Sequence, residues 1–222
     1  MVAEKIKEIL STLPDGVKLC AVSKYHSAER IREAYNAGQR IFGESHVQEL
    51  QQKHAELPDD IEWHFIGHLQ TNKIKYIAPY ISLIHAVDSV HLLREINKQG
   101  MRNNRQIPCL LQLHVAQEET KFGFNIEECI EFLRSGEYKE MHGIAITGIM
   151  CMASNTEDEE RIKNDFRLAN SFYEQCCSEL PDLASKFKWR SWGMSNDYEI
   201  AIEEGSNIVR IGSLIFGNRT YR

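Results

Sequence analysis

The sequence predicts an α/β protein in which eight parallel strands alternate with helices and close into a single (β/α)8 barrel. Short runs rich in Val, Ile and Leu recur eight times, and each is followed by a helical pattern of apolar residues. Eight repeats in 222 residues fit a closed barrel of the usual size. The predicted strands are 18–23, 40–43, 62–66, 82–87, 107–115, 143–149, 189–192 and 207–211.

An extra helix over residues 2–10 precedes the first strand, and helix-start signals stand between the later strands. Four segments resemble capping boxes, in which a polar side chain closes the first turn. They begin at Ser45, Thr156, Asn125 and Asn196. An open doubly wound sheet is the alternative fold, but it calls for a glycine-rich loop after the first strand. That loop, residues 24–27, contains no glycine.

Composition indicates an ordinary soluble protein with residues 1–222 in one domain. Hydrophobic residues make up 42% of the chain, charged residues 26%, and the net charge is −6. This charge disfavours nucleic acid and anionic membranes as partners. No secretory signal or membrane-length apolar stretch is present, and the six cysteines form no C-x-x-C pair. We therefore expect a cytoplasmic protein with reduced thiols and no metal site.

Lys24 directly follows the first predicted strand, where barrel enzymes place their active residues. Cys20, Val22 and Lys24 share one face of that strand because side chains alternate. If this face points inward, an amine lies at the mouth of the barrel. Such a partly desolvated amine is a nucleophile toward aldehydes, whereas a lysine that extends into solvent would have no such role.

The loops after the seventh and eighth strands carry the features of a phosphate site. Hydroxyl and backbone N–H groups are available there, and a small residue lets a ligand approach the backbone closely; the residues are Ser195, Gly212 and Ser213. Serines also cap helices without any ligand. Arg210 shares a face of the last strand with Ile208. An inward guanidinium needs an acceptor, either a core carboxylate such as Glu44 or an atom of a ligand.

Pyridoxal 5'-phosphate would use all of these groups. Its aldehyde would form a Schiff base with Lys24, and its phosphate would bind Ser195, Gly212 and Ser213. Its pyridine nitrogen would accept a hydrogen bond from Arg210. An arginine does not readily donate a full proton, so the ring would stay largely neutral and would be a poor electron sink.

At these residues the sequence resembles the pyridoxal phosphate homeostasis protein family, whose fold is similar to the N-terminal TIM barrel of alanine racemase. The likeness covers nearly the whole chain. The segments that carry it are Ala21-Val22-Ser23-Lys24, Phe42-Gly43-Glu44, Trp63-His64-Phe65-Ile66-Gly67-x-Leu69-Gln70-x-Asn72-Lys73, Lys121-x-Gly123, Gly148-x-Met150, Gly193-Met194-Ser195-x-Asp197 and Val209-Arg210-Ile211-Gly212.

The resemblance implies that Lys24 holds the cofactor and that the protein acts in vitamin B6 and amino-acid balance without established catalytic turnover. Ser45 stands where the family usually has Asn, which changes whatever contact is made there. His64 is a candidate cofactor neighbour or a packed core histidine. Lys73 and Lys75 are interpreted as part of a solvated helix face.

Two other functions stay open at this stage. One is a pyridoxal phosphate-dependent racemase or lyase with weak activity that uses Lys24 as its single base. The other is a cofactor-free barrel enzyme that acts on a phosphorylated metabolite through the same lysine. A two-base racemase needs a second group on the opposite face of the cofactor. The sequence ends soon after the last predicted strand, so we expect that face to be open, and we expect a monomer.

Overall fold

The computed structural model describes residues 2–117 and 122–217, and its eight parallel strands close into a barrel in chain order. Each strand pairs with its neighbours in sequence, and β1 also pairs with β8. The predicted fold is confirmed. The strands are β1 (Lys18–Val22), β2 (Ile41–Glu44), β3 (Glu62–Phe65), β4 (Leu83–Val87), β5 (Ile107–Gln112), β6 (Ile144–Met150), β7 (Trp189–Met194) and β8 (Ile208–Ile211).

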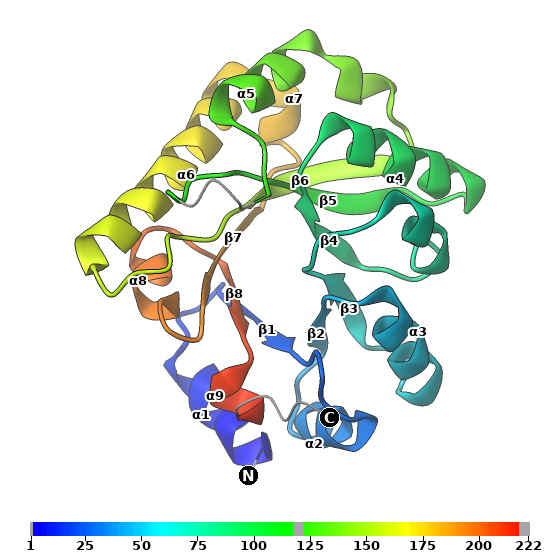
Figure 1. Ribbon diagram of the computed structural model, residues 1–222, viewed down its shortest axis with the longest axis vertical. Coiled ribbons are helices and arrows are strands. Elements are labelled where there is room, and N and C mark those ends of the chain that lie inside the picture. The colour runs from blue at the N-terminus through cyan, green and yellow to red at the C-terminus, as the bar shows by residue number, and fades with distance from the viewer. Residues whose placement is uncertain (1, 118–121, 218–222) are drawn as a thin grey trace.

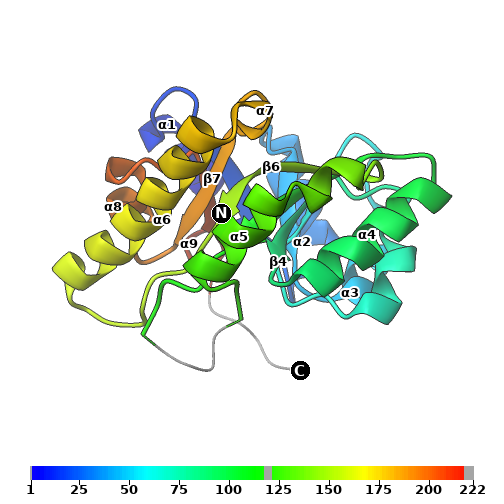
Figure 2. The ribbon, with the colours of Figure 1, turned by 90° about the horizontal axis from the view of Figure 1, so that it is seen from above.

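Helices surround the strands, as Figures 1 and 2 show. They are α1 (Val2–Thr12), α2 (Ala28–Asn36), α3 (Val47–Glu56), η1 (Thr71–Tyr76), α4 (Val90–Arg102), α5 (Ile126–Ser135), η2 (Glu137–Glu140), α6 (Glu159–Glu179), α7 (Pro181–Ala184), α8 (Tyr198–Glu203) and α9 (Ser213–Phe216). The extra N-terminal helix α1 lies beside α9, so the first and last described helices meet on one side of the barrel (Figure 1). No helix of the described ranges is long and apolar enough to cross a bilayer.

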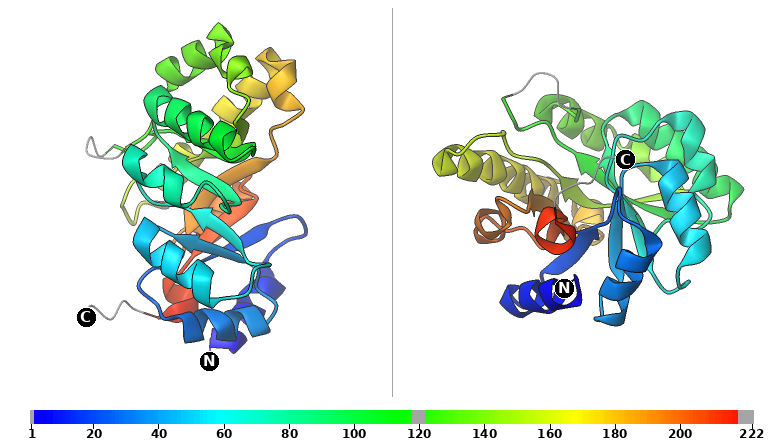
Figure 3. Two further views of the ribbon diagram at one scale, coloured as in Figure 1. Left: turned by 90° about the vertical axis from the view of Figure 1, so that its right-hand side faces the viewer. Right: turned by 60° about the horizontal axis from the view of Figure 1, so that its bottom comes forward.

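Side chains divide between two layers of core. The larger layer fills the space between the strands and the helices and includes Phe42, Phe65 and Trp192. A smaller cluster fills the inside of the barrel and includes Cys20, Leu110 and Ile208. This alternation follows from the two-residue period of a strand, and it decides which residues reach the barrel mouth. The two further views in Figure 3 show the helices on the outside of the strands.

Three of the four predicted capping boxes do not coincide with the observed start of a helix. Asn125 caps α5 as predicted and accepts from the backbone N–H of Glu127. The residues at the start of α3, α6 and α8 are instead His46, Asp158 and Asp197. Each of these three helices begins one or two residues later than predicted. Asp158 is the better cap for α6 because its carboxylate accepts the N–H of Arg161.

Candidate functional site

Six of the seven predicted site residues line one cavity at the carboxyl ends of the strands. This main cavity has a volume of about 1190 Å³. Parallel strands of a barrel present their carboxyl ends at one rim, which brings together segments far apart in the chain. The six residues are Lys24, Ser45, Ser195, Arg210, Gly212 and Ser213.

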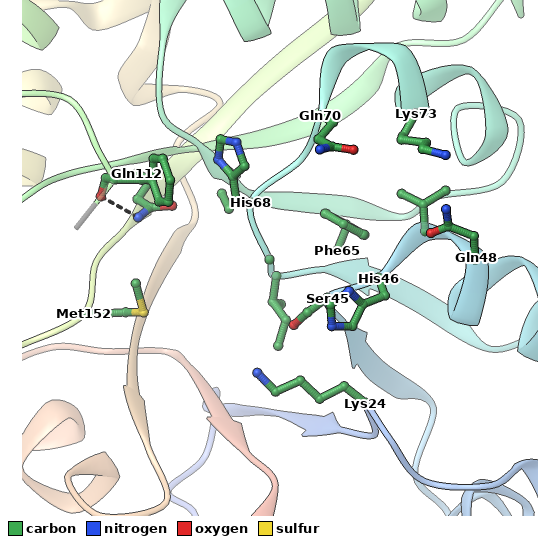
Figure 4. A pocket seen from close by; sticks show the side chains of 15 residues that line it. Lys24, Ser45, His46, Gln48, Phe65, His68, Gln70, Lys73, Gln112 and Met152 are labelled. Carbon is green, nitrogen blue, oxygen red and sulfur yellow. Dashed lines mark hydrogen bonds between the residues drawn. The ribbon is translucent and has the colours of Figure 1, made fainter. Parts of the chain in front are cut away.

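Strand β1 directs alternate side chains to the inside of the barrel. Cys20 lies in the interior cluster, and Val22 and Lys24 line the main cavity. Lys24 is half-buried, and its amine points into the hollow of the barrel mouth in Figure 4. Gly43 of β2 faces Cys20 closely, because a Cβ atom there would lie 2.8 Å from the Cys20 Sγ. The inward face expected for β1 is therefore observed.

The backbone on both sides of Lys24 is held from outside the barrel. Lys53 of α3 donates to the Ser23 carbonyl at 2.7 Å, and the Ser23 hydroxyl donates to Glu44 Oε1 at 2.6 Å. The backbone N–H of Tyr25, whose φ of 67° is rare for a residue other than glycine, donates to Glu49 at 2.5 Å. These contacts fix the loop that carries the amine.

Lys53 joins two carboxylates in this outer network. Its Nζ lies 2.7 Å from Glu44 Oε1 and 2.7 Å from Glu49 Oε1. Burial raises the pKa of Glu44 to about 7, against the opposing effect of the Lys53 charge. Glu44 therefore pairs with Lys53 and Ser23 on the outer side of the sheet, and it is not the acceptor for Arg210 that the sequence had suggested.

The loops after β7 and β8 contact each other at the rim. Ser195 Oγ accepts from the backbone N–H of Gly212 at 3.3 Å. A Cβ atom on Gly212 would lie 3.1 Å from the carbonyl oxygen of Val22, so this glycine lets the loop approach β1. Ser213 follows as the first residue of α9 and is exposed. Hydroxyl and N–H groups thus gather at the rim of the main cavity, which Ser45 also lines.

Arg210 is buried inside the barrel and its Nη atoms contact only neutral acceptors. Nη1 donates to the Ser191 carbonyl and hydroxyl oxygens, both at 2.7 Å, and Nη2 donates to the Cys151 carbonyl at 3.0 Å. Nε makes no hydrogen bond within residues 2–117 and 122–217. Burial lowers the pKa of the guanidinium from its usual value, although such a group stays charged.

A chain of hydrogen bonds continues from Arg210 across the barrel interior. Ser191 Oγ lies 2.9 Å from His85 Nδ1, and His85 Nε2 lies 2.9 Å from His64 Nδ1. Because the Ser191 hydroxyl oxygen already accepts from Arg210, we assign the Ser191 hydroxyl as the donor to His85 Nδ1. His85 then carries its proton on Nε2, which donates to His64 Nδ1. Burial lowers the pKa of His64 to about 3 and that of His85 well below its usual value.

His64, the seventh predicted residue, is therefore packed inside the barrel at the end of this chain. It lines neither of the two cavities at the barrel mouth. The sequence analysis did not single out His85 or Ser191, because a histidine or serine within a strand carries no local signal of an inward polar chain. Strand alternation accounts for the inward direction of His64 on β3 and of His85 on the paired strand β4. It does not identify Ser191 on β7 as their partner.

A second cavity, here called the lateral cavity, shares Lys24, Ser45, Ile66 and Met152 with the main cavity. Its volume is about 510 Å³, and Figure 4 shows the residues around it. Lys73 lines it and is half-buried, so it is less exposed to solvent than a residue of a fully solvated helix face. The neighbouring Lys75 is exposed, as expected for such a face.

Three other observations concern a motif residue, a loop histidine and the cysteines. Lys121, part of one family segment, lies outside the described residues. His68 follows β3 in the loop before η1, where it contacts Asp88 at 2.9 Å and stacks on Phe122. All six cysteines are free thiols, and five of them are buried.

Comparison with known proteins gives consistent matches over the whole chain. The family model of the alanine racemase N-terminal domain matches residues 1–220. Proteins named pyridoxal phosphate homeostasis protein are similar in sequence. The one from Aquifex aeolicus is 40% identical over 92% of this chain and 88% of its own length. The one from Homo sapiens is 34% identical over 99% of this chain and 85% of its own length.

Solved structures agree with these matches. PipY of Synechococcus elongatus with pyridoxal phosphate bound is 33% identical, covers 98% of this chain and 100% of its own, and has a TM-score of 0.90. An alanine racemase from Bartonella henselae has a TM-score of 0.72 at 16% identity and covers 98% of this chain but only 59% of its own. The second similarity concerns the fold alone.

Proposed function

Because the chain belongs to the pyridoxal phosphate homeostasis protein family, within the wider alanine racemase N-terminal domain family, we propose that it binds pyridoxal 5'-phosphate in the main cavity. Lys24 would hold the cofactor as a Schiff base. The cellular role would be vitamin B6 and amino-acid homeostasis in the cytoplasm, by a single-domain monomer. The observation that carries the proposal is that Lys24, Arg210 and Ser195 line one cavity.

The residues of the main cavity fit this cofactor. When bound, pyridoxal phosphate supplies an aldehyde that condenses with an amine. Lys24 offers the amine, and the loops that carry Ser195, Gly212 and Ser213 offer donors for a phosphate. Arg210 has an unsatisfied Nε–H within the described chain and suits a neutral ring nitrogen, since it donates without giving up its proton.

We favour homeostasis over turnover because the buried histidines linked to Arg210 are poor proton donors at neutral pH. His64 and His85 are neutral in the folded protein and lie deeper in the barrel. A neutral cofactor ring beside Arg210 also gives little stabilisation to a carbanion. The alternative is a racemase or lyase with weak activity in which Lys24 is the single base.

The test is the visible spectrum of the purified protein before and after Lys24→Ala. We expect a yellow absorbance band in the wild type that the substitution abolishes. Lys75→Ala, which changes an exposed lysine outside both cavities, should leave the band unchanged. A colourless wild-type protein that takes up no added pyridoxal phosphate would refute the proposal.

A second experiment separates binding from turnover. The loaded protein is incubated with amino acids in deuterated water, and exchange of the α-hydrogen is followed by NMR. We expect exchange no faster than with free pyridoxal phosphate. Sustained exchange that Lys24→Ala abolishes would favour the enzyme alternative instead.

A further inference from the structure

The lateral cavity differs in charge from the main cavity beside it. Glu157, Glu159 and Asp197 are among the residues that line the main cavity. Lys24, Lys73, His46 and His68 line the lateral cavity, and no described Asp or Glu does so. In a chain with a net charge of −6, such a surface attracts anions.

Lys73 is the cation of the lateral cavity that no described carboxylate neutralises. Its Nζ makes no ion pair within the described ranges, and the Tyr76 ring lies 5.9 Å away. His68, in contrast, is already bonded to Asp88. Gln70 and Lys73 lie on the side of the hollow opposite Lys24 in Figure 4.

The neutral walls of the lateral cavity indicate which chemical class of anion would fit. Gln48 and Gln70 supply amide donors, while Phe65, Phe122 and Met152 supply apolar surface. A short carbon skeleton with one carboxylate matches this combination. A phosphate group would find better donors among the backbone N–H groups and hydroxyls of the β7 and β8 loops.

We propose that the lateral cavity binds the carboxylate of a small amino acid or 2-oxo acid, with Lys73 as the charged determinant. The binding itself requires no cofactor. Its biological meaning rests on the proposed function, because Lys24 lines both cavities and the lateral cavity therefore joins the site proposed for pyridoxal phosphate.

The test uses cofactor-free protein and saturation-transfer NMR with propionate as the probe and propionamide as its neutral counterpart. We expect saturable binding of propionate that is tighter than that of propionamide. Lys73→Gln should weaken propionate binding about fivefold, as for one half-exposed ion pair, and leave propionamide unchanged. Lys73→Arg should restore the affinity, and Lys75→Gln, on the same segment, should have no effect.

Competition then identifies the source of the carboxylate. Displacement of propionate by L-alanine supports an amino acid, and displacement by pyruvate supports a 2-oxo acid. Equal binding of propionate and propionamide, no effect of Lys73→Gln, or stronger displacement by inorganic phosphate would overturn the proposal. Because the cofactor is absent, these outcomes are independent of the absorbance test, and either proposal can fail while the other stands.

Discussion

His64 and His85 are held neutral in the barrel interior, since burial lowers the pKa of both rings. The neutral forms suit the chain that begins at Arg210, because each ring must accept at one nitrogen and can donate at the other. A protonated ring in this chain would face the Arg210 charge without a counter-ion. At mildly acidic pH, His64 and His85 therefore bind fewer protons in the folded protein than in the unfolded protein.

The first prediction is a pH dependence of stability from His64. Its folded pKa of about 3 lies below its usual 6.5, so the unfolded chain binds more protons between these values. This contribution to the free energy of unfolding is complete above pH 6.5 and is lost as the pH falls toward 3. Urea unfolding of cofactor-free protein should show that His64→Gln flattens the slope by up to about 1.4 kcal/mol per pH unit.

The matched control for this measurement is His91→Gln, which changes an exposed histidine on α4. It should leave the slope as in the wild type. A His64→Gln slope identical to that of the wild type would mean that His64 titrates normally in the folded protein.

Single residues also mark the limit of what the sequence predicts. Strand alternation correctly directs Lys24 and Arg210 inward, because that rule needs only local spacing. It does not identify the acceptors of Arg210, which are Ser191 on β7 and Cys151 directly after β6 rather than Glu44. Such contacts depend on which strands come together when the barrel closes, and no short segment of sequence determines this.

At the scale of elements, α3 stabilises the loop after β1 through Lys53. The Glu44–Lys53 pair is fully enclosed, and the Ser23 carbonyl depends on the same ammonium group. Removing one partner of a buried pair leaves an uncompensated charge, whereas removing both does not.

The second prediction follows from this pair. Lys53→Met should reduce the free energy of unfolding by about 3 kcal/mol, and Glu44→Gln combined with Lys53→Met should recover part of that loss. Both variants should retain pyridoxal phosphate less well than the wild type, since the loop around Lys24 loses its outer contact. Chemical denaturation and the loss of absorbance on dialysis measure the two effects. Wild-type stability of Lys53→Met would contradict the assigned role.

The third prediction concerns the loops after β7 and β8. Replacing Ser195 and Ser213 together by Ala should weaken pyridoxal phosphate binding, at about 1.5–3 kcal/mol for each hydrogen bond to the charged phosphate. Equilibrium dialysis measures the affinity, and Ser178→Ala on the exposed face of α6 is the control. Unchanged affinity in the double variant would exclude a phosphate site in these loops.

Element boundaries show why prediction of helices and strands is approximate here. All eight strands were predicted, because Val-, Ile- and Leu-rich runs covered on both faces are distinctive. The strand over 107–115 was too long, since β5 ends at Gln112. Ser45 was expected to cap a helix, but its backbone packs against Gly67, where a Cβ atom would lie 2.7 Å from Ser45 Cβ. That contact between two loops is not local in sequence.

The whole molecule is organised by closure of β1 on β8. This pairing joins the beginning and the end of the described chain and completes the rim that carries Lys24 and Gly212. Closure gives each strand two neighbours, so no strand edge is left to separate on its own. We therefore expect the barrel to unfold as one cooperative unit.

The fourth prediction tests this cooperativity and the assignment of one domain to the chain. Trp63 on β3 and Trp192 on β7 are fully buried in different parts of the barrel. In cofactor-free protein, Trp189→Phe combined with either Trp63→Phe or Trp192→Phe leaves one tryptophan as reporter. The urea transitions followed by its fluorescence, each corrected for the stability of its variant, should coincide with those followed by circular dichroism. Separate transitions for the two reporters would indicate independently folding parts.

Cys20 of β1 and Lys24 just after it point to the inside of the barrel, but of the two only Lys24 lines a cavity at the barrel mouth. Burial raises the pKa of the Cys20 thiol to about 12, and the close approach of Gly43 leaves little room beside its sulfur. The thiolate, the form that attacks carbonyl carbon, is therefore scarce at neutral pH. If the barrel binds an aldehyde as proposed, the tight packing of the first two strands would leave the amine of Lys24, and not this thiol, as the group that reacts with it.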